Sequence, residues 1–276
     1  MHLHRDASTG QEQVFLKAPI FGEPWQNEVA AAGASTVRGF LGAQPSRERL
    51  IALTHKVMAS TSQLAEGFLA RAPAGTVACK AGCDHCCYQS VGVTPPEAIA
   101  IFEFVKQTRT GAAFEAFAAH VAERYTQTRG LSSSERFSPQ HPCVFLESGR
   151  CSIYEVRPLS CRGMNSLNAE ECATRLRDPE ARAAFLLNGA GSHSFLEPIR
   201  AFHALSAGLQ LGLAELYALD VRPLDLIAAM QLLLRDSESV VRDWMSGAPA
   251  FESTLGSDSS GSAAIRRLSG ALSADE

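Results

Sequence analysis

Four thiols lie within nine residues of this chain, at Cys79, Cys83, Cys86 and Cys87. A structural cysteine behaves as a small hydrophobe and is usually found singly on an apolar face. Here the intervening residues are polar or flexible: Lys80, Gly82, Asp84 and His85. Thiolates that converge from a polar loop are typical ligands of a soft metal ion or an iron–sulfur cluster. The segment therefore predicts that the chain binds metal through cysteine.

A second group of cysteines follows at Cys143, Cys151, Cys161 and Cys172. Short apolar runs flank residues 147–150 and predict a β-hairpin, with Cys143 and Cys151 at its ends or on its paired strands. Asn168 begins a capping pattern that places Cys172 in the first turn of a helix, where the helix dipole favours the thiolate. A closed metal site would take ligands from both groups, because such ligands also fix the fold.

The number and the identity of the metals remain open at this point. Eight thiols complete two four-ligand sites, or one such site with spare thiols. Adjacent cysteines such as Cys86 and Cys87 tend to point apart, so one of them faces a second site or stays free for redox chemistry. Zinc sites usually show separated C-x2-C pairs, whereas this chain has one such pair within a denser cluster. That density slightly favours an iron–sulfur cluster or iron over zinc.

Several residues near the cysteines have two interpretations each. His85 and His141 are candidate ligands, although a histidine is more often a surface or supporting group. Arg157 and Arg162 flank Cys161 and either stabilise thiolates or pair with Asp84 or Glu155. We expect Tyr154 to lie in the core of the hairpin and Glu97 to act as a helix cap.

The rest of the chain predicts a mainly α fold with one small cysteine-rich β-hairpin. Apolar residues recur at helical spacing in several segments. These segments are 46–71, 95–105, 112–125, 195–219 and 223–235. Thr94 and Glu97 form a capping box at the start of the second one, with Pro95 in its first turn.

We divide the chain into four parts. Residues 1–45 are expected to be an extended N-terminal arm and residues 46–190 a cysteine-cluster metal-binding domain. Residues 191–246 are expected to be a helical extension packed on that domain. The Ser- and Gly-rich residues 247–276 predict a disordered tail.

Composition excludes some classes of protein. The 276 residues carry a net charge of −4, so no basic field predicts binding to nucleic acid. No apolar run approaches the ~18 residues of a membrane span, and no apolar signal segment follows the N-terminus. We therefore expect a cytoplasmic protein, in which eight cysteines are more often ligands or reactive thiols than disulfides.

Both cysteine groups together resemble a known family. The spacing Cys79-x3-Cys83-x2-Cys86-Cys87, followed by CVFL at Cys143 and by CSIYEVRPLSCR from Cys151, resembles the YkgJ-type cysteine-cluster family. That family is described as zinc- or iron-chelating, and some members are labelled iron–sulfur oxidoreductases. The resemblance covers about residues 75–175. It implies that the cysteines from Cys79 to Cys161 hold metal, while Cys172 lies beyond the strongest part of the motif.

Three classes of function stay open. The first is metal binding for structural use or electron transfer, with an unknown protein or small-molecule partner. The second is a cluster-dependent enzyme, either an oxidoreductase or a methyltransferase like the distantly similar flagellin lysine methylases; its catalytic residues are unknown. The third is a helical interaction module with a structural zinc. The triad Cys79, Cys83 and Cys86 also equals that of radical S-adenosylmethionine enzymes, but the near absence of predicted strands argues against their barrel.

Overall fold

Most of the described chain is helical, as the sequence predicts. The computed structural model describes residues 2–5, 12–15, 19–42, 45–72, 76–189, 191 and 193–255. Within them the α-helices are α1 (Pro24–Leu41), α2 (Arg47–Arg71), α3 (Pro95–Thr108), α4 (Ala112–Thr128), α5 (Ser133–Arg136), α6 (Leu159–Gly163), α7 (Ala169–Arg177), α8 (Pro179–Asn188), α9 (Leu196–Tyr217) and α10 (Leu226–Met245). The 3₁₀ turns are η1 (His85–Tyr88), η2 (Tyr154–Val156) and η3 (Glu252–Thr254).

The strands of the described residues form three short antiparallel pairs and no larger sheet. They are β1 (His2–Arg5) with β2 (Glu12–Phe15), β3 (Gly92–Val93) with β6 (Leu224–Asp225), and β4 (Leu146–Glu147) with β5 (Arg150–Cys151). The last pair is the hairpin that the sequence predicts. The β3–β6 pair joins segments far apart in the chain and was not predicted, because two-residue strands leave no periodic signal.

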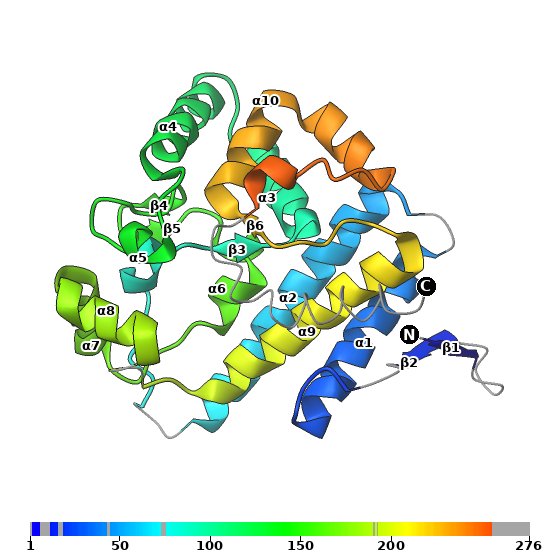
Figure 1. Ribbon diagram of the computed structural model, residues 1–276, viewed down its shortest axis with the longest axis horizontal. Coiled ribbons are helices and arrows are strands. Elements are labelled where there is room, and N and C mark those ends of the chain that lie inside the picture. The colour runs from blue at the N-terminus through cyan, green and yellow to red at the C-terminus, as the bar shows by residue number, and fades with distance from the viewer. Residues whose placement is uncertain are drawn as a thin grey trace.

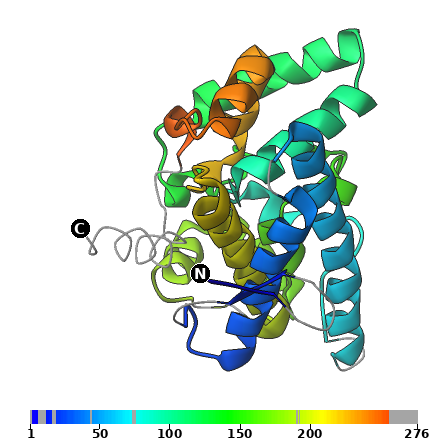
Figure 2. The ribbon, with the colours of Figure 1, turned by 90° about the vertical axis from the view of Figure 1, so that its right-hand side faces the viewer.

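Three long helices run side by side through the body of the molecule: α1, α2 and α9 (Figures 1 and 2). Helices α3 and α10 contact each other, and α3 also packs on α2. Fully buried apolar side chains from these helices form one core. Representative members are Leu50, Ile101, Leu213, Met230 and Trp244. This helical body is the support on which the cysteine segments lie.

The prediction of an extended arm over residues 1–45 is wrong for residues 24–41, which form α1. Its contact with α9 is very close, because a Cβ atom at Gly208 would overlap the carbonyl group of Ala30. One turn on, a Cβ at Gly212 would lie 3.2 Å from the Cα of Ala34. The small residues of α1 are therefore a helix-packing face. Residues 43–44, in the link to α2, lie outside the described residues.

The C-terminal end of the body also differs from expectation. The disorder predicted from residue 247 onward is wrong for residues 247–255, which turn back onto α10. Phe251 is 1% exposed and meets the ring of Trp244 edge-on at 6.5 Å. The Trp244 indole in turn donates a hydrogen bond to the Asp220 carbonyl at 2.6 Å. Two buried aromatic rings thus hold this segment in place, although its Ser, Gly and Pro residues are typical of a disordered one. Residues 256–276 lie outside the described residues.

None of the helices in the described ranges combines the length and the apolar character that a membrane crossing requires.

Candidate metal centre

The first cysteine segment is a loop held by backbone hydrogen bonds. It runs from residue 76 to residue 91, and η1 is its one helical turn. The Ala78 amide donates to the Ser166 carbonyl at 2.8 Å, and the Cys143 amide donates to the Cys87 carbonyl at 2.7 Å. None of the side chains of residues 76–91 is fully buried. The loop is therefore fastened to the second cysteine segment but contributes little apolar burial of its own.

The β4–β5 hairpin positions Cys143 and Cys151. Leu146 pairs with Cys151 across the hairpin, and the turn residues Ser148 and Gly149 have φ values of 50° and 72°. Two consecutive positive φ angles are typical of the tight turn that suits twisted strands. Cys151 thus lies on β5, whereas Cys143 lies just before β4 at the base of the hairpin.

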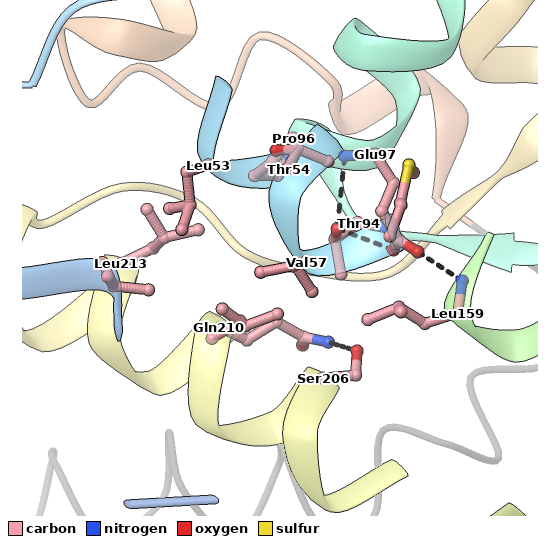
Figure 3. A pocket seen from close by; sticks show the side chains of 13 residues that line it. Leu53, Thr54, Val57, Thr94, Pro96, Glu97, Leu159, Ser206, Gln210 and Leu213 are labelled. Carbon is pink, nitrogen blue, oxygen red and sulfur yellow. Dashed lines mark hydrogen bonds between the residues drawn. The ribbon is translucent and has the colours of Figure 1, made fainter. Parts of the chain in front are cut away.

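Short helices position the last two cysteines. Cys161 lies on α6, and the Leu159 amide at the start of that helix donates to Glu97 Oε1 at 2.7 Å (Figure 3). Cys172 lies in the first half of α7, where the Asn168 side chain accepts hydrogen bonds from the amides of Glu170 and Glu171. The capping pattern predicted for α7 is confirmed.

The structure brings cysteines of both segments into electrostatic contact. Cys79 interacts with Cys83, Cys86 and Cys172. A second set consists of Cys87, Cys143, Cys151 and Cys161. Cys143 and Cys151 interact with each other, and Cys87 and Cys161 each interact with both of them. Cys86 interacts with members of both sets, namely with Cys79 and with Cys151 and Cys161. The eight thiols therefore fall into two neighbouring groups that share Cys86 as their link.

Nitrogen donors hydrogen-bond to four of the sulfurs. The Ser166 amide donates to Cys79 Sγ at 3.2 Å, and the Arg175 guanidinium donates to Cys172 Sγ at 3.0 Å. Backbone groups of Phe145 and Ile153, each two residues beyond a cysteine, hydrogen-bond to Cys143 and Cys151. Such donors stabilise a thiolate, and hydrogen bonds to sulfur also tune metal–thiolate centres. The donor chemistry therefore fits a soft metal ion or a cluster.

Burial disfavours the thiolate form and therefore raises the pKa of most of these thiols. It raises the pKa of Cys143 to about 12 and also raises the pKa values of Cys79, Cys151 and Cys161. Cys86 is the exception, because a hydrogen bond with Cys87 lowers its pKa to about 7. Ligand thiols bind as thiolates, so metal binding would release protons from the thiols whose pKa is raised.

The two candidate histidines have different surroundings. His85 belongs to η1, and its Nδ1 is 3.9 Å from a carboxylate oxygen of Asp84. The pKa of His141 is lowered by burial and by the cations Arg124 and Arg136. Tyr154, expected in the hairpin core, is instead 60% exposed, so that prediction is wrong.

As placed, no group of three or more His, Cys, Asp or Glu side chains among the described residues has the geometry to hold a metal ion. The chemistry of the donor set fits, but the sulfurs would have to draw together to close a coordination sphere. A loop without buried side chains can make that movement at little packing cost, and metal binding is commonly coupled to such ordering.

Comparison with known proteins agrees with this chemistry. Residues 78–178 match the model of the CxxCxxCC family, whose description is "Putative zinc- or iron-chelating domain". This segment is therefore similar to that family. It contains all eight cysteines, and the match supports metal binding in general terms. No curated protein and no solved structure matches the chain.

Sequence reasoning missed two residues that support the cysteine segments. Glu97 caps α3 as predicted, yet its carboxylate also reaches Leu159, 62 residues away. Arg175 was not singled out, although it is 9% exposed and bonded to Cys172 Sγ. Its position three residues after Cys172, on the same face of a helix, is the signal that could have identified it.

Proposed function

We propose that this chain is a metal-binding protein of the YkgJ type that holds iron, as an iron–sulfur cluster, or zinc through its eight cysteines. The ligand set proposed is Cys79, Cys83, Cys86, Cys87, Cys143, Cys151, Cys161 and Cys172. The observation that carries this proposal is the fastening of loop 76–91 to the hairpin and to α7, which gathers thiols from both segments. The cytoplasm, where thiols stay reduced, is the compartment that suits such a set.

The two thiol groups support two neighbouring centres. Cys87, Cys143, Cys151 and Cys161 supply four sulfurs to one of them. Cys79, Cys83 and Cys172 supply three to the other, with Cys86 as its fourth. Under this proposal the adjacent Cys86 and Cys87 serve different centres. Iron–sulfur chemistry is favoured by the exposure of Cys79 and Cys86, because an accessible centre suits electron transfer more than a closed structural site.

A structural zinc is the second candidate, and one observation favours it. Residues 76–91 bury none of their side chains fully, so a metal would supply the stabilisation that packing does not. A zinc bound there would fix the loop against the helical body and require no open coordination position.

Elemental analysis together with an absorption spectrum of anaerobically purified protein tests the proposal. Iron with acid-labile sulfide and a broad absorption band near ~400 nm is the expected result for a cluster. Stoichiometric zinc without visible absorption would favour the structural candidate. Folded protein with eight titratable thiols and neither metal would overturn both.

A further inference from the structure

The Arg157 guanidinium has no hydrogen-bond or ion-pair partner in the described part of the chain. Its guanidinium lies 4.0 Å from the centre of the exposed Tyr154 ring, a cation–π contact. Its Nε atom is buried without a hydrogen bond, and the ion pairs of the described residues do not include it. The alternative raised by the sequence, pairing with Asp84 or Glu155, is therefore not what the structure has. Asp84 instead lies near His85.

Arg162 is a buried cation whose hydrogen-bond partners among the described residues are all neutral. It is 3% exposed. Its guanidinium donates to the Arg157 carbonyl at 2.9 Å and to two further oxygens, the Ser62 hydroxyl and the Glu155 carbonyl. The Glu97 carboxylate is within electrostatic range, but its oxygens are already committed to Thr94 and Leu159. The guanidinium is thus well hydrogen-bonded, while its charge lacks a direct counter-ion.

Both cations lie within electrostatic range of thiols. Arg157 interacts electrostatically with Cys86, Cys151 and Cys161, and Arg162 interacts with Cys151 and Cys161. The two guanidinium groups also repel each other. Two neighbouring cations without a carboxylate partner are unfavourable unless another anion lies beside them. Thiolates are the anions that this site can supply: four of them around a divalent ion carry a net charge of about −2.

We propose that Arg157 and Arg162 balance the negative charge of the metal–thiolate centre that contains Cys151 and Cys161. They act as positioning residues: their charges stabilise the thiolate sulfurs, and they do not bind the metal themselves. This inference rests on the proposed function. It predicts that replacement of either arginine by a neutral residue weakens metal binding, although all the ligand sulfurs are still present.

Arg157 gives the cleaner test, because its guanidinium makes no hydrogen bond with any described residue, so no such loss would complicate the result. The protein loaded with zinc is titrated with a chromophoric chelator, which yields the dissociation constant of zinc. For Arg157→Gln we expect that constant to rise by about tenfold or more, the scale seen when a supporting group of a metal site is removed. Arg157→Lys keeps the charge, so it should bind zinc clearly more tightly than Arg157→Gln. If iron is the metal, Arg157→Gln should lower the reduction potential. The Arg157 cation stabilises the reduced state, which is the more negative one, and this stabilisation is lost in the variant.

Arg47→Gln is the matched control. Arg47 is also a partly buried arginine, but it pairs with Glu103 and Glu238 on the helical body. Its replacement should leave the zinc constant unchanged. If Arg157→Gln binds zinc as tightly as the wild type, or if Arg157→Lys weakens binding equally, the charge-balance inference is overturned while the proposed function stands. A wild-type protein that binds neither zinc nor iron would overturn both.

A separate observation concerns the interior of the helical body. A cavity of about 30 Å³ lies between α1, α2, α3, α6 and α9 (Figure 3). Gln210 lines it, is 8% exposed, and donates from Nε2 to the Ser206 hydroxyl at 3.0 Å. Its Oε1 atom is buried and has no hydrogen-bond partner among the described residues. An exchange of the amide oxygen and nitrogen would leave the nitrogen unpaired instead, so the amide lacks a partner in either orientation.

We infer that this cavity binds an ordered water molecule that donates a hydrogen bond to Gln210 Oε1. The volume suffices, because one water needs about 10–15 Å³ of such space. Further polar partners are at hand, since Thr54, Thr94 and Ser206 line the same cavity. The water would connect α9 with α2 and with the capped start of α3.

A crystal structure of the wild type, with a second data set from a xenon-pressurised crystal, tests this inference. We expect a density peak about 2.8 Å from Gln210 Oε1 and no xenon in the cavity. In Gln210→Met the peak should disappear. Xenon at the site would show a dry cavity, and a Gln210 side chain turned to bond directly with Thr54 or Thr94 would remove the need for water; either result would overturn the inference.

Discussion

At the scale of single residues, Glu97 connects the helical body to the cysteine segments. It is 5% exposed, and its carboxylate accepts hydrogen bonds from the Thr94 amide, the Thr94 hydroxyl and the Leu159 amide (Figure 3). The bond from the Thr94 amide belongs to the capping box of α3, and the bond from the Leu159 amide holds the start of α6, which carries Cys161. One buried side chain thus fixes both a helix end and the approach of a proposed ligand.

Replacement of Glu97 by alanine should therefore destabilise the protein. It would leave the buried amides of Thr94 and Leu159 without acceptors, at a cost of roughly 1–3 kcal/mol each. We expect a lower free energy of unfolding in urea, by about 3 kcal/mol. Glu135→Ala is the matched control, because Glu135 forms the same capping box with Ser132 on the exposed helix α5. A loss at Glu97 no larger than that at Glu135 would contradict the role assigned to the Leu159 contact.

The residue scale also shows what sequence could and could not predict. The thiols, the α3 capping box and the β4–β5 turn depend on residues within a few positions of each other, and all three were recognised. The bond from Leu159 to Glu97 and the position of Arg157 over Tyr154, away from Asp84 and Glu155, depend on tertiary packing. No local pattern encodes which of several nearby acceptors a long side chain will reach.

At the scale of elements, the contact of α1 with α9 distinguishes the structure most from the sequence prediction. Helix α1 buries Ala30, Gly33, Ala34, Val37 and Leu41, which follow helical spacing. Small residues form most of this stripe, so it lacks the bulky apolar pattern by which α2 and α9 were recognised. The same small residues allow the two backbones to approach closely, and the partner positions on α9 are Gly208 and Gly212.

Gly208→Ala tests this contact. Its new Cβ would meet the backbone of Ala30, which cannot move as a flexible side chain could. We expect the free energy of unfolding to fall by about 2 kcal/mol or more, since overpacking forces the backbone to shift. Gly67→Ala in α2 is the control: nothing lies within 4 Å of its Cβ position, so the change should stabilise the helix by about 0.5–1 kcal/mol. Equal effects of the two substitutions would contradict the close approach.

At the scale of the whole molecule, the helical body and the cysteine segments differ in what holds them together. The body has a continuous apolar core contributed by α1, α2, α3, α9 and α10. Loop 76–91 is joined to the rest mainly through backbone hydrogen bonds. The two parts should therefore respond differently when metal is lost.

Single cysteine substitutions test whether both segments contribute ligands. Cys83→Ser and Cys151→Ser change one sulfur in each segment for an oxygen, a poorer ligand for soft metals. Each should sharply reduce the metal content measured by elemental analysis of the purified protein. Ser160→Ala, beside Cys161 but without a sulfur, is the control and should keep the full content. Full metal content in both cysteine variants would exclude a centre built from the two segments.

Removal of metal by a chelator should act locally. Amide hydrogen exchange, followed by mass spectrometry before and after chelation, can separate the loop from the body. We expect exchange in residues 76–91 to accelerate by an order of magnitude or more, because metal binding and the ordering of its ligands are coupled. Exchange in α1 and α9 should change little, since their protection depends on the apolar core and on the close contact between them. Equal acceleration in the loop and in these helices would mean that the metal holds the whole fold, and unchanged exchange in the loop would mean that backbone hydrogen bonds alone suffice to order it.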